Sequence, residues 1–140
     1  MLNKEFVPYE QSLALKELGF DEPCIAFYDK LKFFNNTKLC FVSQRVNNSI
    51  FNSIKNDGTL ISAPLYQQAF RWFREKHGLI GQPIPLSISY PGKVTHYGWS
   101  IVSNQNSNDW ENENDRFKSY EEAESACLDK LIEIVKNKQD

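Results

Sequence analysis

The pattern of apolar positions is clearest between Pro64 and His77, where it follows the period of a helix. Apolar side chains recur at intervals of three and four residues, and Gly78 follows as a residue suited to end a helix. This set comprises Tyr66, Ala69, Phe70, Phe73 and His77, and Leu65 and Trp72 widen it. The opposite side carries Gln67, Gln68, Arg71, Arg74 and Glu75. The spacing predicts an amphipathic helix with one buried face.

Two further helices are predicted nearer the ends of the chain. The first runs from about Pro8 to Leu18, because proline suits a first helical position and a glycine follows the last apolar residue. The last opens with a capping box from Ser119 to Glu122, in which each side chain is expected to accept a hydrogen bond from the other residue's backbone N–H. The apolar spacing continues this helix to about Lys136.

Four extended runs rich in branched and aromatic residues predict strands. They cover residues 24–28, 39–42, 84–90 and 97–101. The predicted order is helix, two strands, helix, two strands, helix. This order favours an α+β fold with one antiparallel sheet of about four strands and the helices packed on one face. The whole chain, residues 1–140, is predicted to form a single domain.

Two segments are less well defined by their pattern. From Gln44 to Ile61 the chain is rich in asparagine and serine, which fits either a long loop or a third weak hairpin around Asp57-Gly58. Residues 104–116 are polar and are expected to form a loop.

Composition and charge narrow the class of protein. Of 140 residues, 41% are apolar, which favours a folded globule, and the formal net charge of −2 does not favour a binder of duplex nucleic acid. The three cysteines, Cys24, Cys40 and Cys127, are odd in number and lie in apolar segments, so we expect them to be reduced. The first residues do not resemble a signal peptide, and no apolar run suffices for a membrane span. A cytoplasmic protein without a membrane anchor is expected.

The motifs of the commonest cofactor-dependent enzymes are missing from the sequence. The six glycines do not form a phosphate-binding loop, and two histidines, His77 and His96, are too few for a multi-histidine metal centre. No cofactor, metal or catalytic residue is predicted. An enzyme is disfavoured, although a hydrolase or transferase using a polar hairpin face with Ser87, Ser89, Ser100 and His96 stays as a third alternative.

The candidate binding residues are Arg71, Arg74 and His77 on the predicted second helix and Trp110 in the polar loop. Arginines interleaved with aromatic residues are used to bind phosphates, bases or acidic protein surfaces. An indole in a polar loop often marks a contact surface. The alternative is a solvated helix face whose cations favour the C-terminal end of the helix dipole, with Trp110 folded back onto the domain.

Three stretches, taken together and in order, resemble a known group of proteins. They are residues 9–24, 63–77 and 119–135. The chain resembles a widespread group of short uncharacterised proteins of Bacteroidetes-type bacteria and their phages. The resemblance implies a phage or mobile-element setting and a cytoplasmic location. It implies no activity and no catalytic residue.

These observations favour a small non-enzymatic binding or accessory protein that acts on a host factor. The alternative is a protein that binds a nucleotide or single-stranded nucleic acid through Arg71 and Arg74 with aromatic stacking. The expected partner is therefore a protein, with a nucleotide or a single strand as the second choice. A homo-oligomer is left open.

Overall fold

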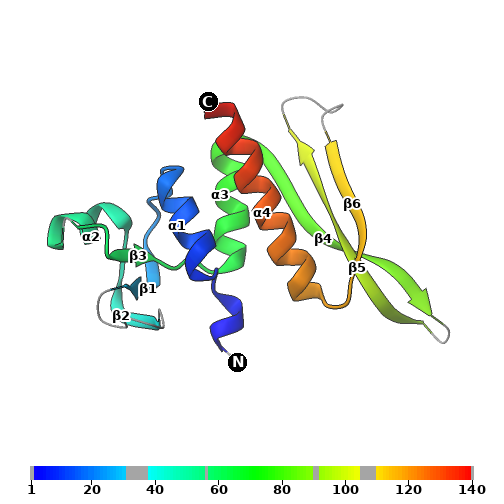
Figure 1. The fold of residues 1–140 in the computed structure, drawn as a ribbon, viewed down its shortest axis with the longest axis horizontal. Coiled ribbons are helices and arrows are strands. Elements are labelled where there is room, and N and C mark those ends of the chain that lie inside the picture. Colours follow the sequence, from blue (N-terminus) through cyan, green and yellow to red (C-terminus); the bar gives the residue numbers. More distant parts are fainter. Residues whose placement is uncertain (1, 31–37, 56, 90–91, 105–109, 140) are drawn as a thin grey trace. The chain divides into compact units, whose positions relative to one another are not determined.

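A computed structural model describes residues 2–30, 38–55, 57–89, 92–104 and 110–139 (Figure 1). Within those ranges the side chains of residues 2–3, 87–89 and 110–116 are not described. The chain divides into two compact units, Met1–Ala69 and Phe70–Asp140, and helix α3 (Tyr66–His77) contributes residues to both. The single domain expected over residues 1–140 stays a prediction.

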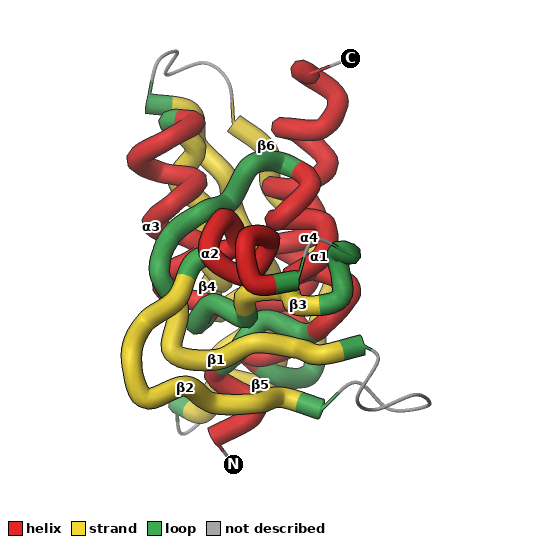
Figure 2. Tube along the Cα trace, turned by 90° about the vertical axis from the view of Figure 1, so that its left-hand side faces the viewer, coloured by secondary structure: helices red, strands yellow, loops and turns green. Residues whose placement is uncertain are grey.

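The first unit contains a short 3-10 helix, two α-helices and three strands among its described residues. They are η1 (Leu2–Glu5), α1 (Tyr9–Glu17), β1 (Cys24–Asp29), β2 (Leu39–Val46), α2 (Asn48–Ile54) and β3 (Leu60–Ser62). The strands form an antiparallel sheet in the order β2-β1-β3. Figure 2 shows β1 and β2 running side by side.

The first predicted helix is confirmed, including its C-terminal cap. Pro8 is the N-cap of α1 rather than its first helical residue. Gly19 takes a φ of 97°, a left-handed conformation that favours glycine. The chain then folds back, so that the Phe20 N–H donates to the Leu15 carbonyl at 2.9 Å and the Phe20 ring is buried. A local sequence signal was sufficient here because the cap involves residues only five positions apart.

The sheet of the first unit receives helices on both faces, which corrects the prediction of helices on one face only. On one face, Ala26 and Tyr28 form a buried cluster with Phe6, and the ring of Tyr28 lies 5.7 Å from that of Tyr9 in α1. The neighbouring residue of β1, Phe27, points to the other face, and its ring lies 5.1 Å from that of Phe51 in α2. Successive residues of a strand point to opposite faces, so β1 joins the two layers.

The segment from residue 44 to residue 61 forms α2 and β3, neither a long loop nor a hairpin. Asn47 caps α2, because its side chain accepts a hydrogen bond from the Ile50 N–H at 2.9 Å. The expected turn at Asp57-Gly58 is present. The Asp57 carboxylate accepts hydrogen bonds from the backbone N–H and the hydroxyl of Thr59, and Gly58 has a φ of 75°.

Among its described residues, the second unit contains the rest of α3, three strands and a long helix. The strands are β4 (Leu79–Ser89), β5 (Lys93–Ser103) and β6 (Trp110–Phe117), and the helix is α4 (Tyr120–Gln139). The strands pair antiparallel in the order β4-β5-β6, and α4 packs against this sheet (Figure 1). The predicted single sheet of about four strands is therefore wrong. In the described residues the strands form two sheets of three, and the element order includes α2, β3 and β6 in addition.

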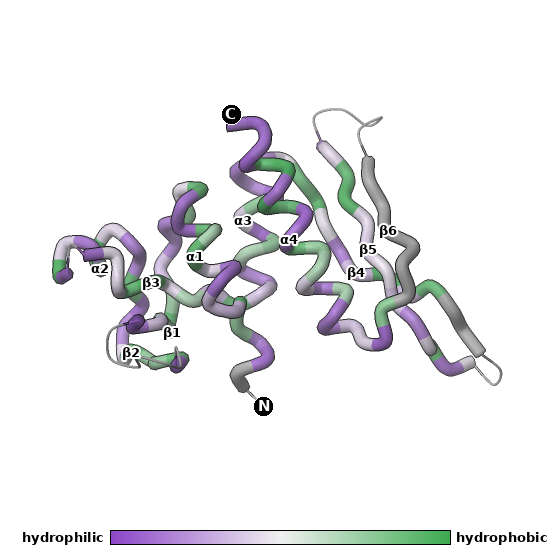
Figure 3. Tube along the Cα trace, in the orientation of Figure 1, coloured by the Kyte–Doolittle hydropathy of each residue, from purple (hydrophilic) through white to green (hydrophobic). Residues whose placement is uncertain are grey.

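Alternation along β4 and β5 separates a face covered by α4 from an open face. At Gly81 a Cβ atom would lie 2.9 Å from Cδ1 of Leu131 and 3.0 Å from Sγ of Cys127, so the absence of a side chain lets α4 approach closely. The preceding residue, Ile80, lies on the open face, where it pairs with Val102. The side chains of Ile80 and Val102 are 38% and 40% exposed. Figure 3 shows hydrophobic stretches of β4 and β5 alongside α4.

Strand β6 replaces most of the loop expected over residues 104–116. Its main chain pairs with β5, from Val102 opposite Trp110 to Tyr97 opposite Phe117. This segment is polar and lacks the apolar alternation that predicts a strand. It forms a strand because its main chain pairs with that of β5. The capping box of α4 is present in part. The Glu122 N–H donates to Oγ of Ser119, while the Glu122 carboxylate accepts from the N–H of Lys118 instead of that of Ser119.

Candidate functional site

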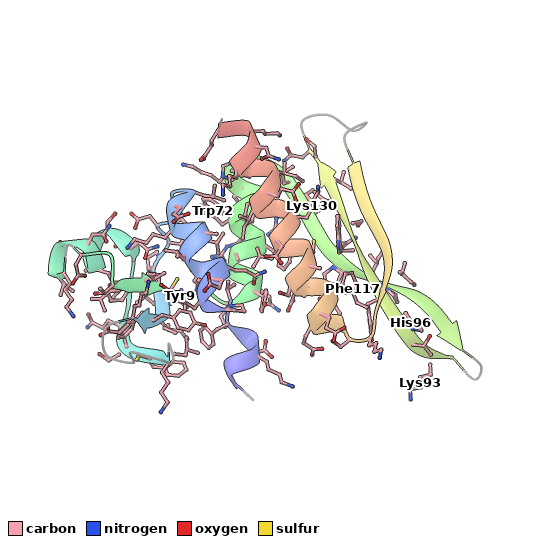
Figure 4. All side chains as sticks on the ribbon, in the orientation of Figure 1. Tyr9, Trp72, Lys93, His96, Phe117 and Lys130 are labelled. Carbon is pink, nitrogen blue, oxygen red and sulfur yellow. The ribbon has the colours of Figure 1, made fainter. Side chains whose placement is uncertain are left out.

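Helix α3 has the two-sided character that its sequence predicts. Its apolar side is buried: Ala69 and Phe73 have no exposed surface, and Trp72 is 5% exposed. Figure 4 labels Trp72 on this helix. The exposed side chains of α3 are all polar or charged, namely Gln67, Arg71, Arg74, Glu75 and Lys76.

Arg71 and Arg74 form what we call the cationic face of α3. The two residues are three positions apart, which separates them by about 60° around the helix axis and one turn along it. Both are exposed. Arg74 also lies in the last turn with Lys76, where cations are stabilised by the negative end of the helix dipole. This placement fits a contact surface, and it fits equally a solvated helix face.

His77 differs from the two arginines in its surroundings. Its ring lies 4.8 Å from the ring of Trp72 and 5.9 Å from that of Phe73. The Nε2 atom is buried and has no hydrogen-bond partner among the residues that the structure describes. Burial, with a smaller contribution from Lys76 and Lys138, lowers the pKa of His77 below its ordinary value. The imidazole therefore belongs to the aromatic side of α3 rather than to its cationic face.

The aromatic residues beside the arginines do not form an exposed stacking platform. Trp72 and Phe73 contact each other edge to face, with ring centroids 5.0 Å apart, and both are buried. A base or nucleotide needs an accessible ring face for stacking. The interleaving of arginine with Trp72 and Phe73 thus reflects the helical period, which places these two rings on the buried side of α3 and the arginines on its exposed side.

For Trp110 the structure describes the main chain. Its main chain begins β6 and pairs with Val102 of β5, so this residue lies on a strand and not in a loop. Its side chain lies outside the described residues, and its role in binding stays a prediction.

The third alternative placed chemistry on the polar face of the β4–β5 hairpin. His96 is half-buried, and its Nδ1 atom lies 3.1 Å from the Thr95 hydroxyl; Figure 4 labels His96 and Lys93 on this hairpin. The side chains of Ser87 and Ser89 lie outside the described residues. Among the described side chains no group of three or more histidine, cysteine or acidic residues is arranged to hold a metal ion.

Cys127 is unsuited to act as a nucleophile. It is fully buried under β4, and burial raises the pKa of its thiol to about 12. Because the thiolate is the reactive form, a thiol with this pKa is almost entirely protonated at neutral pH.

One exposed feature was missed by sequence reasoning because α2 was not predicted. Ile50 and Ile54 are one turn apart on this helix and are 47% and 67% exposed. Phe41 of β2 is 50% exposed, with its ring 5.5 Å from that of Phe6. The signal that could have revealed α2 is Asn47, a strong N-cap residue, followed by apolar residues at helical spacing.

None of the helices in the described part of the chain combines the length and the apolar character needed to cross a membrane. Comparison of the sequence with protein-family models and curated proteins, and of the structure with solved structures, finds no match to this chain.

Proposed function

We propose that this chain is a small non-enzymatic binding protein, encoded by a phage or mobile element, that acts on a protein of its host. The observation that carries the proposal is the cationic face of α3. The buried side of the helix supplies its packing, and Arg71 and Arg74 both lie on its exposed side. Arginine is favoured at protein interfaces because its planar group makes paired hydrogen bonds to carboxylates.

A protein partner is preferred over a nucleotide for a structural reason. Of the aromatic residues beside the arginines, Trp72 and Phe73 are buried and Phe70 is half-buried, so the described part of α3 offers charge without a fully exposed ring for stacking. An acidic segment of a protein needs only the charge and the fork geometry of arginine. The mobile-element setting rests on the resemblance of residues 9–24, 63–77 and 119–135 to proteins of Bacteroidetes-type bacteria and their phages.

The test is a comparison of three tagged versions of the chain in host lysate. The wild type, an Arg71→Ala/Arg74→Ala variant and a Lys118→Ala/Lys136→Ala variant are used for capture, and bound proteins are quantified by mass spectrometry. The control variant removes two exposed cations that lie outside α3 and changes the net charge equally. The proposal expects a host protein that the wild type and the control retain and the arginine variant loses.

The same purified samples also test the alternative function, the binding of a nucleotide or a single-stranded nucleic acid. A nucleotide or single strand that co-purifies and dissociates steeply with added salt would favour the nucleic-acid function. A partner set that is identical for all three versions would show that α3 is not the contact surface.

A further inference from the structure

His77 occupies an unusual position for a titratable side chain. It is the last residue of α3, followed by Gly78 with a φ of 68°, and the Gly78 carbonyl accepts a hydrogen bond from the N–H of Asn104, the residue after β5. The imidazole therefore stands where the helix ends and the chain turns into β4. Its ring contacts are made with Trp72 and Phe73, both on the buried side of the same helix.

His77 is half-buried, and its position favours the neutral ring over the charged ring. The Nε2 atom is buried without a hydrogen-bond partner in the described part of the chain, which a neutral imidazole tolerates at a moderate cost. A protonated imidazole carries an N–H on both nitrogens and requires an acceptor or water for each. The charged groups that act on the ring are Lys76 from α3 and Lys138 from α4, and both are cations. A carboxylate partner is thus lacking among the described groups that influence this histidine.

We propose that His77 is a pH-responsive latch for the C-terminal turn of α3: the neutral ring closes the turn against Trp72 and Phe73, and protonation releases it. On release, the charged ring moves into water and away from the two lysines. The helix dipole favours a cation at this end, but that effect acts within the last turn and is available to the released ring as well. Arg74 and Lys76 lie on the same turn, so release would also rearrange the cationic face, a consequence that rests on the proposed function.

The direction of the pH effect follows from the histidine's surroundings. The pKa of His77 in the folded chain is below the ordinary value of 6.5, chiefly because the ring is desolvated. The released ring is expected to have the ordinary pKa of 6.5, which is higher than the pKa of the closed ring. As pH falls through 6.5, the released state therefore binds a proton more readily than the closed state, and acid favours release. Closure is complete at neutral pH and weakens as the solution becomes acidic.

The test uses the free chain, so its failure would leave the proposed function standing. Nitrogen-15 NMR follows the imidazoles of the two histidines from pH 8 to pH 5, and His77→Gln identifies the signals of His77. Hydrogen exchange of the amides of residues 74–78, corrected for the intrinsic effect of pH, is compared with that of residues 128–131 in α4. We expect His77 to titrate below 6.5, and amide protection at residues 74–78 to fall by about fivefold or more while α4 is unchanged.

Two variants without a titratable group complete the design. His77→Phe keeps a ring against Trp72, and His77→Gln removes the ring, and neither is expected to show the pH-dependent step in exchange. The latch is refuted by a His77 titration at or above 6.5, by a step that persists in both variants, or by a loss of protection in α3 and α4 together.

Discussion

The side chain of Asn48 accepts a hydrogen bond from the backbone N–H of Ser62 at 2.9 Å, and this contact attaches the start of α2 to β3. The same amide donates to the Phe20 carbonyl at 2.9 Å. Asn48 is 4% exposed, so both bonds are made away from water. One buried side chain thus connects three segments of the first unit: the end of the α1 turn, α2 and β3.

Replacing Asn48 by alanine leaves a buried N–H and a buried carbonyl without these partners. Since each unsatisfied group costs about 1–3 kcal/mol, we expect Asn48→Ala to lower the free energy of unfolding by about 2–4 kcal/mol. Asn47→Ala removes only the exposed helix cap and should cost about 1 kcal/mol. Urea unfolding followed by circular dichroism measures both. Equal losses for the two variants would contradict the connecting role of Asn48.

Gly81 is predicted to be intolerant of any side chain. The Cβ of Gly81→Ala would approach Cδ1 of Leu131 and Sγ of Cys127 to 2.9 and 3.0 Å, so α4 must shift or repack. Overpacking of this kind costs about 1–3 kcal/mol, which unfolding by urea can resolve. The neighbouring Gln82→Ala, at an exposed position, should change stability by less than about 0.5 kcal/mol. A Gly81→Ala variant as stable as the wild type would show that α4 does not lie this close.

The hydroxyl of Tyr28 donates a hydrogen bond to the Val7 carbonyl at 2.9 Å, and the hydroxyl of Ser12 donates to the same oxygen at 3.1 Å. Tyr28→Phe alone should cost about 1 kcal/mol, because Ser12 remains as a donor. Tyr28→Phe combined with Ser12→Ala removes both donors, and we expect a loss larger than the sum of the single losses. Strict additivity in urea unfolding would show that the two bonds are independent.

The ionisation of Tyr28 gives a pH dependence with a defined sign. Burial, with a smaller effect from Tyr66, raises the pKa of Tyr28 from 10.0 to about 12. The unfolded chain therefore loses this proton first, so the contribution of Tyr28 to stability is complete below pH 10 and decreases as pH rises from 10 toward 12. Tyr28→Phe should reduce the alkaline loss of stability. An unchanged alkaline profile would argue against a buried, protonated Tyr28.

The three cysteines should differ in reactivity toward an alkylating reagent. Cys24 and Cys127 are buried, and burial raises the pKa of each thiol to about 12, whereas Cys40 is half-exposed. At pH 8 the folded chain should take up one label quickly, at Cys40, and label the other two at least about tenfold more slowly. Cys40→Ser should abolish the fast phase in intact-mass measurements. Rapid labelling of Cys127 would reopen the possibility that it acts as a nucleophile.

The sequence was sufficient where the structure depends on neighbours along the chain. The helical period of residues 66–77 placed Arg71 and Arg74 on the exposed side of α3 and Phe73 on the buried side. The turn at Gly19 and the capping residue Ser119 were likewise predicted, since each involves contacts within about one or two turns of helix. Such signals are local, so no knowledge of the remaining fold is needed to interpret them.

Tertiary structure decided the features that depend on distant pairings. The division into two sheets and the formation of β6 follow from hydrogen bonds between strands, which polar residues such as those at positions 111–115 can make without an apolar pattern. The environment of His77 depends on ring contacts and on Lys138, which is 61 positions away along the chain (138 − 77). The period of α3 assigned His77 to the apolar side, but only the folded structure shows that its Nε2 atom is buried with no partner among the described residues, because burial depends on everything packed around the atom.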